Sequence, residues 1–199
     1  MRDSVVSDSS FYIAFLSPNE INDPETLAEI LRKYKFFLGK VVLNEVKEKH
    51  SDLLELIGFE ELANISERYD YSVLLSIIGD KLFEKGEYEC MAIAYHIYRK
   101  SELHSLILDD NSARRFVENN IPNLCPFVKY SLRFLVNCYC SEQKLSRSKV
   151  FAILNKVKQA VKNGNRPFNL TEKNIDIVDQ LLNEVDECQK LNSTQRWRK

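Results

Sequence analysis

The chain has 199 residues and nearly balanced charge, since 28 Lys and Arg stand against 29 Asp and Glu and the formal net charge is -1. This length buries a substantial core without staples, and the balanced charge excludes a uniformly basic nucleic-acid binder. The five cysteines form no Cys-x-x-Cys pair, which predicts reduced thiols and argues against a disulfide framework or a zinc knuckle. No apolar run reaches about 18 residues and the N-terminus lacks the order of a signal peptide, so we expect a cytoplasmic protein without membrane contact.

The first part of the chain alternates short apolar runs with helical patterns. The predicted elements are a strand at 4–7, a helix starting at 11–16, a helix beginning at 23–25, a strand at 40–43, a charged helix at 46–57 and a strand or connection at 62–65. The helix start at Asp23-Pro24-Glu25 is typical, because proline fits the first helical turn.

The second part begins with the same alternation and then becomes helical only. Its predicted elements are helices at 71–83 and 87–99, a strand at 104–108, a helix at 113–119, and three further helices at 128–139, 148–161 and 174–188. Strands alternating with helices favour an α/β fold, a three-layer sandwich with a short, mainly parallel central sheet and a C-terminal helical extension. We therefore predict a first domain at 1–127, a helical extension packed on it at 128–191 and a disordered tail at 192–199.

Four carboxylates lie where apolar runs begin or end. They are Asp8, Glu45, Glu89 and Asp110. Each has a simpler explanation taken alone, because aspartate before a helix is a favoured N-cap and glutamate in a first turn suits the helix dipole. If the apolar runs are neighbouring strands and a packed helix, the acids converge as an oxygen-only site for Mg²⁺ or Mn²⁺. Such a site hydrolyses phosphodiester bonds, since the cation polarises a phosphoryl oxygen and activates water.

The motifs around these acids resemble those of a PIN domain. They are Val5-Val6-Ser7-Asp8-Ser9-Ser10, then Glu45, then Gly86-Glu87-Tyr88-Glu89-Cys90-Met91-Ala92-Ile93-Ala94, and then Leu108-Asp109-Asp110-Asn111-Ser112-Ala113-Arg114-Arg115. The chain looks most like the branch with a Gly-Glu-x-Glu-Ala-Ile-Ala helix and an Asp-Asp-x-x-Ala-Arg loop, over about residues 4–127. The resemblance implies a metal-dependent ribonuclease, often the toxin of a toxin–antitoxin pair, with an antitoxin protein as partner and a homodimer as a common assembly.

The resemblance also implies roles for single residues. The expected metal-binding and catalytic carboxylates are Asp8, Glu45, Glu89 and Asp110. Auxiliary roles fall to Glu87 and Asp109 near the metal, to Ser10 as the hydroxyl supporting the first acid, and to Arg114 near the substrate phosphate. The sequence departs from the family pattern at Leu124-Cys125-Pro126, where the family often has a small pair after the last strand. This departure concerns the residues that would hold the site in shape at that position, and not the carboxylates themselves.

Positive charge gathers in one segment. From Gln143 to Thr171 the chain has seven Lys or Arg and no acid. Lys149 and Lys156 are seven residues apart and share a helical face, so we expect them to contact RNA through its phosphates. A solvated helix face is the alternative explanation of such a run.

Two other functions compete with the ribonuclease. A PIN-like fold can bind RNA or a protein without cutting, although four acids that repel one another argue against lost activity. Residues 83–95 also resemble one helix of a tetratricopeptide unit, which suggests a helical adaptor. No second copy follows at the 34-residue spacing of those repeats, so this reading ranks last.

Overall fold

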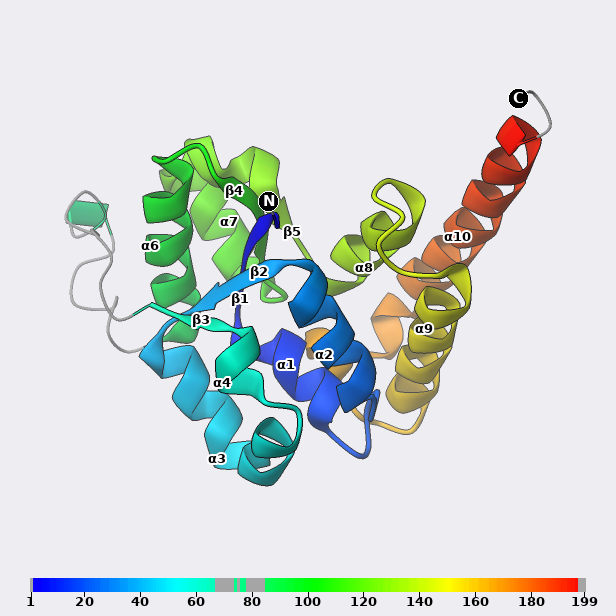
Figure 1. Cartoon of the computed structure of the whole chain (residues 1–199), viewed down its shortest axis with the longest axis horizontal. Coiled ribbons are helices and arrows are strands. Elements are labelled where there is room, and N and C mark those ends of the chain that lie inside the picture. Colours follow the sequence, from blue (N-terminus) through cyan, green and yellow to red (C-terminus); the bar gives the residue numbers. More distant parts are fainter. Residues whose placement is uncertain (1, 67–73, 75, 78–84, 197–199) are drawn as a thin grey trace.

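The computed structural model describes residues 2–66, 74, 76–77 and 85–196, with side chains up to residue 190. Its centre is an all-parallel sheet in the order β3-β2-β1-β4-β5 (Figure 1). The strands are β1 (Ser4–Ser7), β2 (Lys35–Leu38), β3 (Asn64–Ile65), β4 (Leu103–Ile107) and β5 (Val128–Lys129). The predicted α/β class with a parallel sheet is therefore confirmed.

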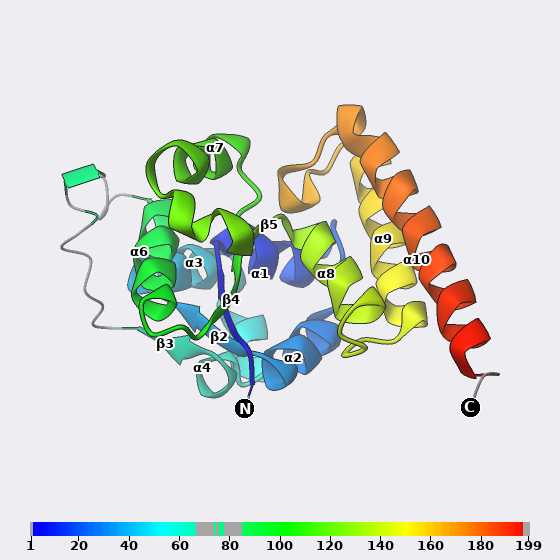
Figure 2. The same cartoon turned by 90° about the horizontal axis from the view of Figure 1, so that it is seen from above.

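Helices flank the sheet and continue beyond it. Those within the first part are α1 (Ser9–Leu16), α2 (Pro24–Lys33), α3 (Lys40–Leu56), α4 (Phe59–Leu62), α6 (Gly86–Tyr98) and α7 (Asn111–Asn120), followed by the 3-10 helix η2 (Pro122–Phe127). After β5 come α8 (Ser131–Cys140), α9 (Arg147–Lys162), η3 (Pro167–Asn169), η4 (Glu172–Asn174) and α10 (Ile175–Arg196). Figures 1 and 2 show α6 and α7 on one side of the sheet and α1 and α2 on the other, an arrangement compatible with a three-layer sandwich.

An aromatic core joins the sheet to the C-terminal helices. Phe11 of α1 stacks on Phe36 of β2 with ring centroids 5.6 Å apart, and Phe134 of α8 meets the Phe11 ring edge-on at 6.0 Å. All three side chains are fully buried. The helix that follows β5 therefore shares one core with the sheet.

One predicted strand is wrong. Lys40–Leu43 forms the first turn of α3, and the strand lies just before it at Lys35–Leu38. Val42 and Val46 are both buried and four residues apart, so the β-branched run follows a helical period, whereas β2 alternates buried and half-buried residues. The helical part of that prediction, from 46 to 57, is confirmed by α3.

Two further differences concern element ends. The helix predicted from 128 begins at Ser131, because Val128 and Lys129 pair with β4 as the fifth strand, so the sheet continues past residue 127. The last helix continues to Arg196, through residues assigned to a disordered tail. The helix predicted at 71–83 lies outside the described residues except for Leu74, Ser76 and Ile77.

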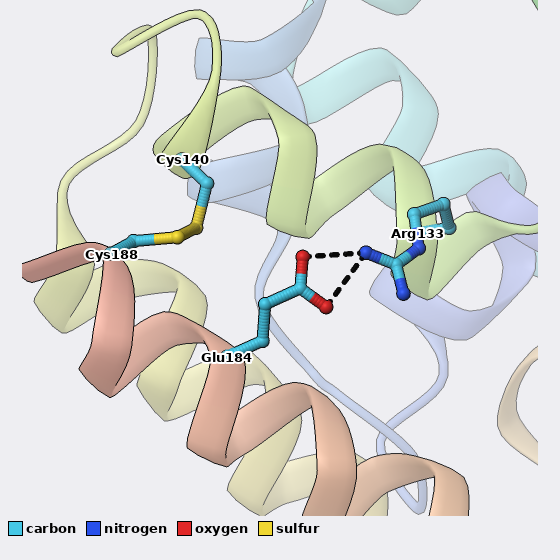
Figure 3. The surroundings of a disulfide bond; sticks show 4 residues. All are labelled: Arg133, Cys140, Glu184 and Cys188. Atoms are coloured by element: carbon cyan, nitrogen blue, oxygen red, sulfur yellow. Dashed lines mark hydrogen bonds and ion pairs between the residues drawn. A yellow bond between two sulfur atoms is a disulfide. The ribbon is translucent and has the colours of Figure 1, made fainter.

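The prediction that all five thiols are reduced is also wrong. Cys140 at the end of α8 is bonded to Cys188 of α10, with Cα atoms 5.6 Å apart (Figure 3). The partners are 48 residues apart in sequence, so neither the odd cysteine count nor local spacing reveals the pair. Nearby, Arg133 donates to both carboxylate oxygens of Glu184 at 2.6 and 2.8 Å, a second link between the two helices.

None of the helices in the described part of the chain is both long and apolar enough to cross a bilayer.

Candidate functional site

Two buried carboxylates meet at the carboxyl ends of β1 and β4. These strands are neighbours in register, with Val6 beside Leu106, so the residues that follow them converge at one edge. The backbone N–H of Asp109 donates to Oδ2 of Asp8 at 3.0 Å, and the Ser10 hydroxyl lies 2.6 Å from Asp8 Oδ1 and 2.7 Å from Asp109 Oδ2. Although Asp8 occupies the N-cap position of α1, its side chain makes no capping hydrogen bond. The helix-cap explanation therefore fails for Asp8.

Ser131 completes the support of this pair. Its backbone N–H donates to Asp109 Oδ1 at 2.8 Å and its hydroxyl donates to Asp109 Oδ2 at 2.6 Å. Ser131 follows β5, the last strand, whereas Leu124-Cys125-Pro126 lies in η2 before that strand. The departure at 124–126 thus lies before the last strand, and the residue that supports Asp109 after that strand is Ser131.

The surroundings of the two carboxyl groups raise the pKa of both. Burial first, and then the negative charge of Asp109, raise the pKa of Asp8 to about 7, and burial likewise raises the pKa of Asp109. The Ser10 hydroxyl lies within hydrogen-bond distance of both carboxyl groups and links them. A proton that binds here below neutral pH belongs to the Asp8 and Asp109 pair as a unit.

A cleft of about 270 Å³ opens in front of the pair. Its polar lining includes Asp8, Ser10, Glu20, Glu45, Glu87, Lys49 and Arg166. Glu45 comes from α3 and Glu87 from the first turn of α6, and Gly86 lets the two helices approach, because a Cβ on Gly86 would lie 3.2 and 3.3 Å from the Glu45 carboxylate oxygens. The structure therefore brings Asp8, Ser10, Glu45 and Glu87 of the predicted site to one cleft, with Asp109 bonded behind them.

Glu89 has a different surrounding. Its carboxylate is 4% exposed, accepts the backbone N–H of Val42 at 3.1 Å, and is not part of the cleft lining. A Cβ on Gly39 would overlap the Glu89 carboxyl group, so this glycine is required by close approach. Glu89 thus lies against the N-terminus of α3, where the helix dipole favours a negative charge.

The Asp110 carboxylate turns away from the pair and caps α7. It accepts the backbone N–H of Ala113 at 2.8 Å, as an ordinary N-cap does. Arg114 is also engaged nearby, since its guanidinium donates to the carbonyl oxygens of Leu108 at 2.6 Å and Asp109 at 3.0 Å. Both residues hold the loop after β4 in shape.

The two predicted RNA-binding lysines face α2 and its N-cap. Lys149 forms an ion pair with Glu29, and Lys156 Nζ lies 3.5 Å from Asp23 Oδ2. Neither lines the acidic cleft. The positive segment does reach the cleft, but through Arg166 at its C-terminal end.

A second group of ligand-type side chains lies at the opposite edge of the sheet. Within the described chain, Asp3, His104 and Glu142 are the one set of three such residues whose ligand atoms lie within 4.8 Å of one another. Lys144 forms ion pairs with Asp3 and, at 3.5 Å, with Glu142. Against the effect of burial, hydrogen bonds from His104 and Tyr34 lower the pKa of Glu142 to about 2. Since Lys144 already supplies the positive charge, this group is an ion-pair network joining the sheet to the loop after α8.

The chemistry of the acidic cleft fits a hard divalent cation. Asp8, Glu45 and Glu87 line it with carboxylate oxygens, the ligands that Mg²⁺ and Mn²⁺ prefer, and the described lining contains neither histidine nor cysteine. Asp109 lies behind Asp8, and both of its carboxylate oxygens accept hydrogen bonds from Ser10 or Ser131. Burial raises the pKa of both Asp8 and Asp109, and the negative charge of Asp109 raises that of Asp8 further. Comparisons with protein-family models, with curated proteins and with solved structures give no match to this chain.

Proposed function

We propose that this protein is a divalent-metal-dependent ribonuclease with a PIN-like fold. The observation that carries the proposal is the buried Asp8 and Asp109 pair, bridged by Ser10 and opening into a cleft lined by Glu45 and Glu87. Acids that follow β1 and β4 and acids of α3 and α6 would serve no common structural purpose there, because close carboxylates destabilise one another. A cation between them removes that repulsion.

The geometry changes the ranking of the ligands. We infer that Asp8, Asp109, Glu45 and Glu87 hold Mg²⁺ or Mn²⁺, with Asp109 in place of Asp110 and Glu87 in place of Glu89. Asp110 and Glu89 then act as helix-terminus partners that hold the surrounding elements. In this proposal Ser10 and Ser131 keep the first two carboxylates in position.

The bound cation would polarise a phosphoryl oxygen of RNA and lower the pKa of a water molecule for in-line attack. Ser10 and Ser131 fix the lone-pair directions of Asp8 and Asp109 by donating to them. Glu45 and Glu87 are half-buried at the cleft wall, and either carboxylate can accept the proton of an attacking water. Metal binding requires Asp8 to be deprotonated, so the affinity for Mn²⁺ should rise with pH up to about 7, the pKa of Asp8 without metal.

Adjacent aspartates provide the test. Purified Asp109→Asn and Asp110→Asn variants are assayed for Mn²⁺-dependent cleavage of a single-stranded RNA. We expect Asp109→Asn to reduce the rate constant at least about 100-fold, because it removes a proposed metal ligand that is also linked to Asp8 through Ser10. Asp110→Asn keeps an N-cap residue and should retain activity.

The reverse result, with Asp110→Asn inactive and Asp109→Asn active, contradicts the proposed ligands. Wild-type protein that binds RNA in Mn²⁺ without cleaving it would favour the non-catalytic RNA-binding alternative. The adaptor alternative has less support, because residues 86–98 form a helix packed against β1, β2 and β4. The toxin role, an antitoxin partner and a homodimer stay predictions from the resemblance.

A further inference from the structure

The connection between α9 and α10 reaches the acidic cleft. Arg166, Phe168 and Asn169 line it together with Asp8, Glu45 and Glu87. In Figure 2 this segment, in orange, turns from the paired helices α9 and α10 back toward the middle of the molecule. The connection between the C-terminal helices α9 and α10 thus forms part of the wall of the candidate site.

Phe168 anchors this connection in the core. Its side chain is 3% exposed, and its ring lies 6.3 Å from that of Phe11 and 6.2 Å from that of Phe15, both on α1. Phe168 and Asn169 have φ values of 55° and 59°, a left-handed conformation that non-glycine residues seldom adopt. Two consecutive residues in this conformation persist only where the surrounding structure over-determines them. The anchor fixes the backbone that carries Arg166.

Arg166 differs from the other arginines of the helical extension. Arg133 is paired with Glu184 and Arg147 with Asp186, whereas the Arg166 side chain is exposed and has no hydrogen bond or ion pair among the described residues. The other cation of the cleft is Lys49. In a cleft with several acids, an RNA strand would be repelled wherever no positive group faces its phosphates.

We propose that Arg166 binds a backbone phosphate of the RNA strand at the mouth of the acidic cleft. The inference rests on the proposed ribonuclease function and names the group that holds its substrate. The planar guanidinium presents paired donors that match phosphate oxygens, and an arginine without a competing partner keeps them available. The positive segment then contacts RNA at its C-terminal end, through Arg166. Lys149 and Lys156 instead hold α9 against α2 and its N-cap through their ion pairs.

The test compares Arg166→Ala with Lys162→Ala. Both remove one exposed positive charge near the end of α9, but Lys162 does not line the cleft. Binding of a fluorescein-labelled 12-nucleotide single-stranded RNA is followed by anisotropy in EDTA, which prevents cleavage, at several salt concentrations. We expect Arg166→Ala to raise Kd about tenfold and to reduce the salt slope of log Kd by about 0.7, the value for one phosphate contact on a single strand.

Arg166→Lys should bind with intermediate affinity, because charge is kept and the paired donors are lost. Lys162→Ala should bind like wild type, and circular dichroism melts check that each variant is folded. Equal Kd values for Arg166→Ala and Lys162→Ala, or no RNA binding by wild type, overturn the inference. Wild-type binding that depends on Arg166, without any Mn²⁺-dependent cleavage, would instead remove the ribonuclease proposal and leave the phosphate contact in place.

Discussion

At the scale of single residues, neighbours in sequence have different roles according to where their side chains lie. Asp109 and Asp110 are neighbours in sequence. Asp109 accepts hydrogen bonds from Ser10 and Ser131 in the buried pair, whereas Asp110 caps α7. Sequence patterns place an acid at the end of a strand but do not say which of two successive acids faces the neighbouring strand. That choice depends on the register of β4 against β1, which is a tertiary property.

The Asp8 carboxyl group gives the stability of the protein a defined pH dependence. Its pKa is raised from an ordinary 3.8 to about 7, so the folded state holds a proton that the unfolded state has released between these values. This contribution is present below about pH 4 and is lost as pH rises through about 7. Without divalent metal, wild-type protein should therefore lose stability between pH 5 and pH 8 through this group, whereas Asp8→Asn should lose less.

Thermal melts at pH 5 and pH 8 measure this effect. At pH 8 Asp8→Asn should have a higher melting temperature than wild type, because the substitution removes a buried negative charge. The increase should be about 2–4 °C for each kcal/mol gained. Adding Mn²⁺ should raise the melting temperature of wild type more than that of the variant, because a ligand that binds only the folded state stabilises it. A lower melting temperature for Asp8→Asn at both pH values contradicts the raised pKa.

A second residue-scale prediction concerns Tyr12. Its side chain is fully buried in the aromatic core and its hydroxyl has no hydrogen-bond partner among the described residues. Tyr12→Phe keeps the ring and removes the unpaired hydroxyl, so it should increase the free energy of unfolding by about 1 kcal/mol. Urea denaturation measures this change, and a variant less stable than wild type would show that the hydroxyl is satisfied.

At the scale of elements, close approach between helices decides several positions. Gly39 precedes α3 at the point where the Glu89 carboxylate from α6 reaches the helix N-terminus. The β-branched run after Gly39 resembles a strand in sequence. Packing against α1, α4 and α6 holds the chain as a helix there, and a single sequence does not contain those contacts.

Gly39→Ala tests this packing. A Cβ would overlap the Glu89 carboxyl group, so the buried carboxylate would lose its hydrogen bond from Val42, and we expect a loss of about 2 kcal/mol in unfolding free energy. In a Glu89→Ala background the same substitution should cost much less, because the overlapping group is gone. A double-mutant cycle by urea denaturation measures the coupling, and equal costs in both backgrounds would contradict the contact.

At the scale of the whole molecule, sequence patterns predict the parallel sheet and the edge where the acids meet, but not the contacts that complete the site. Ser131 and Arg166 lie far along the chain from Asp8, after the sequence alternation has given way to helices. Residues 128–129 are too few to show a strand period, so β5 is invisible in the sequence. The C-terminal helices therefore appear as an appendage in the sequence, although the connection between α9 and α10 lines the cleft.

The disulfide between Cys140 and Cys188 holds these helices together, and its removal is the global prediction. It closes a loop of 48 residues, for which restriction of the unfolded chain is worth about 4 kcal/mol. Cys188→Ser should lower the free energy of unfolding by up to that amount, whereas Cys125→Ser, at a half-buried free thiol, should change it little. Dithiothreitol should destabilise wild type and Cys125→Ser but leave Cys188→Ser unchanged. If the reductant affects all three proteins equally, the link between α8 and α10 does not account for the stability. Arg133 and Glu184 still join α8 to α10 after reduction, so the cleft wall at Arg166 should persist. Reduction should therefore lower the free energy of unfolding while changing the affinity for RNA little.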